Sequence, residues 1–222
     1  KFMNPITDFS IRSFLGGYDN NFTYLITCSR TGAQVLVDAA IEFSQVAPFI
    51  HDHPVAVLIT HSHGDHIAHL DHYLQSYPKM TVLGHSDTSA ISGSDPFKAL
   101  KHNQTFKIGQ LSFTAFHTPG HYHDSICYQL DPVLFTGDTI FVGRTGRVIS
   151  AKSDIEDLYD SVYQKILTMP ENTRIYPGHD YGDKGTITLE ENVKISPLLQ
   201  AKNFNDFKKR MEQYEKNRTP GS

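Results

Sequence analysis

One short stretch of the chain, directly after an apolar run, gathers residue types that bind metal ions. In "LITHSHGDHIAHL" (58–70), three histidines and an aspartate fall close together: His61, His63, Asp65 and His66. In an extended loop His61 and His63 point to the same side, because side chains alternate with a period of two. We therefore expect these two imidazoles to coordinate one ion, and Asp65 and His66 to coordinate a second. The alternative interpretation is a polar loop that happens to be rich in histidine.

Three further loops share this pattern, in which a β-rich run ends and a metal-ligand type follows. They are "TPGH" with His121, "TGD" with Asp138 and "YPGH" with His179. Loops at strand ends are where rigid sheets present functional groups. Taken singly, "TPG" is an ordinary turn, and Asp138 is equally suited to a helix cap or turn. Together, imidazole nitrogens and carboxylate oxygens favour Zn²⁺, Fe or Mn, and the two oxygens of Asp138 are suited to bridge two ions.

Composition excludes several functional classes. The chain has 222 residues, a net charge of −4 and two cysteines, Cys28 and Cys127. Without a basic excess, nucleic-acid binding is not expected. No apolar run approaches the ~20 residues that span a bilayer, so we expect no membrane association. Two cysteines and the lack of a signal-peptide core near the start favour a cytoplasmic protein.

Strand and helix patterns alternate along the chain. Strands are predicted at 21–29, 33–40, 54–60, 79–85, 105–109, 111–118, 125–130, 132–138 and from 173. Helices are predicted at 41–53, 67–78 and 153–170, the last capped by Ser153, and a helical tail at about 198–218. This alternation predicts an α/β architecture whose helices cover buried sheets. No linker divides the chain, so we expect a single domain over 1–222.

The four motifs, in this order, resemble the metallo-β-lactamase superfamily over roughly residues 11–200. "FTGDTIF" and "ILTMPENTRIYPGHDY" are most similar to its glyoxalase II (hydroxyacylglutathione hydrolase) branch and to the related persulfide dioxygenases. The resemblance implies a four-layer αβ/βα sandwich with the metal site at one edge. The sequence departs from the family pattern in two places. The stretch after His179, where glyoxalase II enzymes usually hold glutathione, is short, and the loop "VGRTGRVIS" lacks cysteine.

The resemblance also implies a ligand set. The first ion would be held by His61, His63 and His121, and the second by Asp65, His66 and His179, with Asp138 bridging. Two divalent ions are therefore expected, with zinc favoured over iron or manganese. Because Asp138 stands where the main secreted lactamases carry cysteine, β-lactam hydrolysis is not expected.

The function that follows is metal-dependent cleavage of a thioester, such as an acylglutathione, or of a related ester, through a metal-bound hydroxide. Asp65 is assigned a catalytic role in orienting the nucleophile. Four side chains in nearby loops are expected to hold an anionic small-molecule substrate: Arg144, Arg147, Tyr181 and Lys184. A homo-oligomer is compatible with the sequence.

Three alternatives stay open. A persulfide dioxygenase would hold a single Fe(II) by His61, His121 and Asp138, a two-histidine, one-carboxylate triad. A phosphodiesterase acting on RNA needs a basic path, and the basic run at 208–218 is interleaved with glutamates. A binding module without turnover has no chemical need for the full ligand set.

Overall fold

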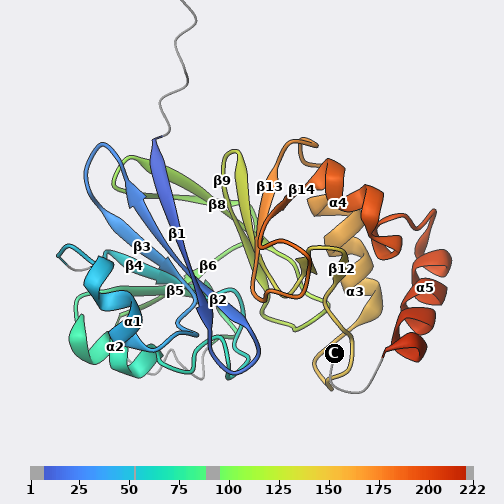
Figure 1. Cartoon of the computed structure of the whole chain (residues 1–222), viewed down its shortest axis with the longest axis horizontal. Coiled ribbons are helices and arrows are strands. Elements are labelled where there is room, and N and C mark those ends of the chain that lie inside the picture. Colours follow the sequence, from blue (N-terminus) through green and yellow to red (C-terminus); the bar gives the residue numbers. More distant parts are fainter. Residues whose placement is uncertain (1–7, 53, 89–95, 219–222) are drawn as a thin grey trace, which may run out of the picture.

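Two six-stranded sheets face each other in the computed structural model, which describes residues 8–52, 54–88 and 96–218 (Figure 1). The first sheet has the order β1-β2-β3-β4-β5-β6. Its strands are β1 (Phe9–Gly16), β2 (Asn21–Cys28), β3 (Gln34–Val37), β4 (Ala56–Leu58), β5 (Thr81–His85) and β6 (Phe97–Leu100). The second sheet has the order β14-β13-β10-β9-β8-β7. Its strands are β7 (Gln104–Ile108), β8 (Leu111–His117), β9 (Ile126–Leu130), β10 (Val133–Gly137), β13 (Arg174–Pro177) and β14 (Ile187–Thr188).

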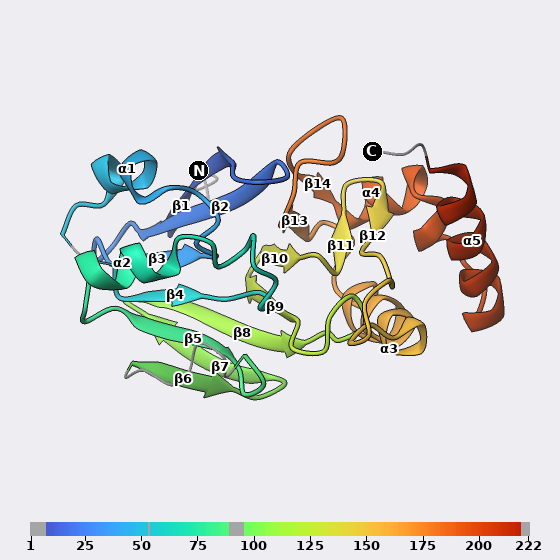
Figure 2. The ribbon, with the colours of Figure 1, turned by 90° about the horizontal axis from the view of Figure 1, so that it is seen from below.

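Helices cover the outer faces of both sheets, as Figures 1 and 2 show. The helices beside the first sheet are α1 (Phe43–Val46) and α2 (Leu70–Ser76). Those beside the second sheet are α3 (Ile155–Asp160), α4 (Leu189–Ile195) and α5 (Phe204–Asn217). A two-stranded ribbon, β11 (Ile140–Phe141) with β12 (Arg144–Thr145), follows β10. Two short 3-10 helices lie at Ala47–Phe49 and Pro197–Leu199.

Three apolar clusters hold these layers together. The central cluster fills the space between the sheets and includes Phe113, Tyr128 and Phe135. A second packs α3, α4 and α5 against the second sheet, and a third packs α1 and α2 against the first. An apolar layer on each side of both sheets is the packing of a four-layer αβ/βα sandwich, so the predicted fold class is confirmed.

Burial along the strands explains how the sequence specifies this arrangement. Strand β10 is buried at every residue, as a continuous apolar run requires when both faces of a sheet are covered. The edge strand β1 instead alternates between half-buried and exposed residues. Strands β3, β4, β5 and β6 run parallel, as do β10 and β13, so their carboxyl ends lie at shared sheet edges. The loops after β4, β10 and β13 leave from these ends, and β8 ends at the same edge as β10 because each is antiparallel to β9 between them.

The helix predicted at 153–170 differs from expectation at its start and in its second half. Its N-cap is Asp154, whose carboxylate accepts from the backbone N–H groups of Glu156 and Asp157, and not Ser153. After Asp160 the helix continues as a π-helix, Ser161–Ile166. Ser153 serves another purpose, because its hydroxyl donates to the carbonyl oxygen of His121 at 2.7 Å.

Helix α5 occupies the stretch where the helical tail was expected, and it buries Phe207 and Met211. Within residues 8–52, 54–88 and 96–218, none of the helices has the length and apolar character that crossing a membrane requires.

Candidate metal centre

The loops that follow β4, β8, β10 and β13 converge and bring the seven predicted ligands together. Two groups form, each with ligand atoms within 4.8 Å of one another: His61, His63, His121 and Asp138 in the first, and Asp65, His66 and His179 in the second. The family resemblance implied the same division of the histidines and Asp65, with Asp138 shared between the two sets. His123 belongs to neither group, although it lies only two residues from His121.

Asp138 touches both groups. Its Oδ2 lies 3.7 Å from His61 Nε2 and 3.4 Å from His121 Nε2 in the first group. The same oxygen lies 3.3 Å from His179 Nε2, and Oδ1 lies 3.2 Å from His66 Nε2, in the second group. Oδ1 is buried and accepts no hydrogen bond from the described residues. A buried carboxylate oxygen without a donor has the environment of a metal ligand.

Close packing of backbone fixes this carboxylate against the second group. Gly137, immediately before Asp138, has φ +48°, a left-handed conformation that glycine adopts without steric cost. At Gly178 a Cβ atom would lie 2.5 Å from Asp138 Oδ1 and 2.7 Å from His66 Cε1. The "GD" and "PGH" motifs therefore need their glycines so that the two loops can approach.

Hydrogen bonds to the outer nitrogen of three imidazoles determine which of their nitrogens faces the centre. Three rings donate Nδ1–H to oxygen: His66 to Asp38 (2.8 Å), His121 to the carbonyl of Arg147 (2.8 Å) and His179 to the carbonyl of Asp19 (2.7 Å). In a neutral imidazole the other nitrogen, Nε2, then carries a lone pair. These Nε2 atoms point into the site.

The inward nitrogens lie close enough together that each pair must share a proton or a cation. His66 Nε2 and His179 Nε2 are 3.1 Å apart, and His63 Nδ1 lies 2.9 Å from His61 Nε2 and 3.1 Å from His121 Nε2. Facing lone pairs repel unless a proton or a metal ion joins them. The donor set of imidazoles and carboxylates therefore fits divalent metal ions.

The charges of the site agree with this fit. Burial, together with the neighbouring His121, lowers the pKa of His63 to about 4, so this ring is neutral at pH 7. Burial also lowers the pKa of His66, but Asp138 and Asp38 outweigh it and raise the pKa well above its usual value. For Asp138 burial raises the pKa, yet His66 and His61 bring it well below its usual range. The centre thus holds an ionised carboxylate that attracts positive charge.

Two residues that the sequence did not single out support the ligands. Asp38 is buried, and its carboxylate accepts from His66 Nδ1 and from the backbone N–H and hydroxyl of Thr60. Asn21 is buried, and its Nδ2 donates to Asp65 Oδ2 at 2.8 Å. Asp38 lay inside the strand predicted at 33–40, and only the observed end of β3 at Val37 places its carboxylate directly after a strand, as in the ligand loops. Asn21 begins a strand, and no sequence signal marked it.

A small cavity of about 120 Å³ lies beside His179, and it receives three of the four predicted substrate-binding residues: Arg144, Arg147 and Tyr181. The ring of Tyr181 stacks on that of His179, with centroids 4.7 Å apart, and the guanidinium of Arg144 lies 4.2 Å from the Tyr181 centroid. Tyr214 and Arg218, at the end of α5 and beyond it, also line this cavity.

The fourth predicted residue, Lys184, does not line the cavity. Its ammonium forms an exposed ion pair with Glu191 at 3.2 Å. Arg147 lines the cavity, but its guanidinium is engaged by both carboxylate oxygens of Glu215, at 2.9 and 2.8 Å. Its backbone carbonyl meanwhile accepts from His121, so Arg147 links α5 to the first ligand group.

A four-layer sandwich with two clustered His/Asp groups at its edge defines a class of metal-dependent enzymes. Residues 16–179 match the metallo-beta-lactamase superfamily, and the chain belongs to that superfamily. Within it, the chain is 32% identical over 194 residues to the probable hydroxyacylglutathione hydrolase glo2 of Schizosaccharomyces pombe, covering 82% of this chain and 70% of that protein.

Two further similarities span nearly the whole chain. The probable polyketide biosynthesis zinc-dependent hydrolase BaeB of Bacillus velezensis is 30% identical over 208 residues, covering 87% of this chain and 89% of that protein. The crystal structure of ETHE1 from Myxococcus xanthus superposes with a TM-score of 0.80 at 29% identity, covering 95% of this chain and 92% of that one. These findings confirm the predicted family and the predicted enzyme class, a glyoxalase II-like metallohydrolase.

Proposed function

We propose that the chain hydrolyses the thioester of an acylated glutathione, using two zinc ions. His61, His63 and His121 would hold the first ion, Asp65, His66 and His179 the second, and Asp138 would contact both. The observation that carries this proposal is the pair of ligand groups that share Asp138. Relatives named as a hydroxyacylglutathione hydrolase and as a zinc-dependent hydrolase support the substrate class and the metal.

When bound, divalent ions supply Lewis acidity and make water a stronger nucleophile at neutral pH. The chain's own residues do the positioning. Asp65 is the most exposed of the charged ligands, with 28% of its side chain accessible, and Asn21 fixes one of its oxygens. Its other oxygen is then placed to accept a proton from the attacking water and to orient that water toward the thioester carbonyl.

The cavity beside His179 would hold the anionic end of the substrate. Arg144 is ordered by the Tyr214 hydroxyl, at 2.6 Å, and by the ring of Tyr181 beneath it. A guanidinium held in place in this way binds a carboxylate with little loss of side-chain entropy. Arg147 and Lys184 are already paired with glutamates, so in this proposal Arg144 and Tyr181 contact the substrate and Lys184 does not.

The test is hydrolysis of a hydroxyacylglutathione by the zinc-loaded chain, monitored through the free thiol that the reaction releases. Asp138→Ala should abolish turnover, because both ligand groups lose a member. Arg144→Gln should raise KM about tenfold with a smaller change in kcat, since a charge-assisted contact is worth roughly 1.5–3 kcal/mol. Lys184→Gln is the matched control and should leave KM unchanged. A zinc-loaded chain that releases no thiol would refute the proposal.

A second candidate, the Fe(II) persulfide dioxygenase, is favoured by one observation. His61, His121 and Asp138 lie within one group, as a two-histidine, one-carboxylate triad requires. Elemental analysis of the purified chain and oxygen uptake with glutathione persulfide separate the two. One iron per chain with oxygen consumption would displace hydrolysis, whereas two zinc ions without oxygen consumption would support it.

A further inference from the structure

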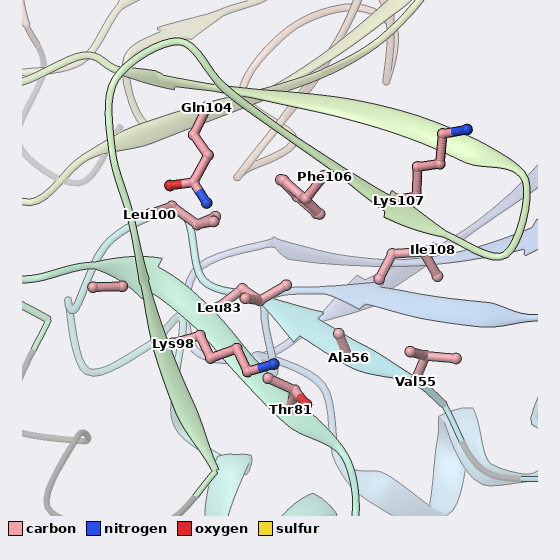
Figure 3. A pocket seen from close by; sticks show the side chains of 11 residues that line it. Val55, Ala56, Thr81, Leu83, Lys98, Leu100, Gln104, Phe106, Lys107 and Ile108 are labelled. Atoms are coloured by element: carbon pink, nitrogen blue, oxygen red, sulfur yellow. The ribbon is translucent and has the colours of Figure 1, made fainter.

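The two sheets part at one end of the sandwich, and a cavity of about 510 Å³ lies between them (Figure 3). It opens between β6 and β7, which are the outermost strands of different sheets. Its apolar walls come from both sheets: Ala56, Leu83 and Leu100 from the first, and Phe106 and Ile108 from the second. A volume of this size falls within the roughly 300–1,000 Å³ of small-molecule sites.

This cavity is separate from the candidate metal centre. Strand β4 begins at the cavity with Ala56, and the loop carrying His61 leaves from its other end. None of the described residues that line the cavity belongs to either ligand group or to the smaller cavity beside His179. The proposed hydrolase therefore does not account for it.

The charged groups at the cavity are all positive. Lys98 and Lys107 line it, and the described lining residues include no carboxylate, although the whole chain carries a net charge of −4. Lys98 lies two residues from the buried Leu100 on β6, so both side chains face the cavity. Lys98 is the register partner of Leu83, and Thr81 lies two residues before Leu83, so the side chains of Lys98 and Thr81 lie on the same face of neighbouring strands (Figure 3).

Lys98 and Thr81 have polar groups available for a ligand. Among the described residues, no hydrogen bond or ion pair engages the Lys98 ammonium, and none engages the Thr81 hydroxyl. Lys107 borders the cavity, but its side chain alternates with the inward-facing Phe106 and Ile108, so its ammonium projects away from the cavity (Figure 3). One end of the apolar cavity thus carries a single inward-facing cation beside a hydroxyl.

We propose that this cavity binds a free medium-chain fatty carboxylate. The carboxylate pairs with Lys98 and accepts from Thr81, and the alkyl chain lies along Leu83, Phe106 and Ile108. A lipid surface is a poorer match, since Val55 is the one large exposed apolar residue, within the described part of the chain, that borders the cavity. The apolar surface is recessed between the sheets. A single alkyl chain can reach it there, and a bilayer cannot.

Isothermal titration of the 222-residue chain with decanoate, below its micellar concentration, tests the proposal. We expect one site per chain. Lys98→Gln should weaken binding about fivefold or more, because it removes a charge-assisted contact. Lys107→Gln, on the neighbouring edge strand but facing outward, is the matched control and should change affinity less than about twofold. Decyltrimethylammonium, with the same alkyl chain and the opposite charge, should not bind.

Amide chemical shifts recorded during the same titration locate the ligand. Decanoate should shift the signals of Leu83, Phe106 and Ile108, and leave those of His61 and His179 in place. The proposal is overturned by equal affinity of the Lys98→Gln variant, by equal binding of the cationic analogue, or by shifts confined to another surface. Binding to phospholipid vesicles but not to free decanoate would equally overturn it.

Discussion

Asn21 determines how Asp65 faces the second ligand group, although it is not itself a ligand. It is fully buried, donates to Asp65 Oδ2 at 2.8 Å and accepts from the backbone N–H of Asp19 at 3.0 Å. Asn21→Ala frees Asp65 to turn toward solvent. We expect the second ion to bind about tenfold more weakly while the first is unaffected, since such supporting contacts are worth roughly 10–100-fold in metal affinity.

Competition with a chromophoric chelator measures both zinc affinities of the Asn21→Ala variant. Asn205→Ala, on the exposed face of α5, is the control. Two unchanged affinities would show that Asp65 does not depend on Asn21.

Asp38 acts on the tautomer of His66. Its carboxylate accepts from His66 Nδ1, which leaves the lone pair on Nε2 toward the centre. In Asp38→Asn the amide NH₂ can donate to Nδ1 instead, moving the ring proton to Nε2 and blocking coordination. Zinc affinity of the second group should fall about 10–100-fold. Thr60→Ser keeps a hydroxyl for Asp38 and should retain normal affinity; an equal loss in both variants would point to general disruption.

At the scale of elements, the inner strands of the two large sheets were predicted, and among the edge strands of the described residues β7 was predicted but β1, β6 and β14 were not. Strands with continuous apolar or β-branched runs, such as β4 and β10, coincide with predicted ranges because their burial on both faces leaves a strong signal. Strands β1 and β6 lie at the edges of the first sheet and were not predicted. Their half-exposed sequences are specified by pairing with a neighbour, which a single sequence does not display.

The helix start was misassigned for a related reason. "SDIE" offers two capping residues in succession, and local sequence favours Ser153 through its spacing from Glu156. The structure uses Asp154 as the cap because the Ser153 hydroxyl is drawn to the His121 carbonyl. The long-range contact decides between two locally similar caps, and it also ties the helix to the ligand loop.

Helix α5 contributes both packing and the Tyr214 contact to Arg144, so its docking is testable on its own. Phe207 is fully buried and packs against Tyr159 and Tyr163, with ring centroids 5.7 and 5.8 Å apart. Phe207→Ala should lower the free energy of unfolding by about 3–5 kcal/mol through lost burial and a residual cavity. Urea denaturation measures the loss, with Asn205→Ala on the same helix as the control. A loss below about 1 kcal/mol would mean that α5 is weakly docked.

For the molecule as a whole, the candidate site follows from strand ends that meet. The seven candidate ligands could be picked out from the sequence because their motifs follow recognisable strands, and the family resemblance divided them into two sets. The sequence could not predict the groups from distant segments that hold them, such as the Asp19 carbonyl or Tyr214 at the end of α5. Those contacts depend on how the sheets and the last helix pack, and no local pattern records that packing.

Metal binding should therefore stabilise the entire fold, since the ligands come from loops of both sheets. Ions that bind only the folded state add to its stability, because they shift the folding equilibrium toward that state. Zinc at 100 times its Kd should add about 2.7 kcal/mol for each site. Calorimetry before and after chelation, with zinc restored in a third scan, should show Tm fall and recover. In Asp138→Ala the difference between chelated and zinc-loaded protein should shrink, because both sites lose a ligand; a full-sized difference in that variant would mean that zinc stabilises the fold from somewhere else.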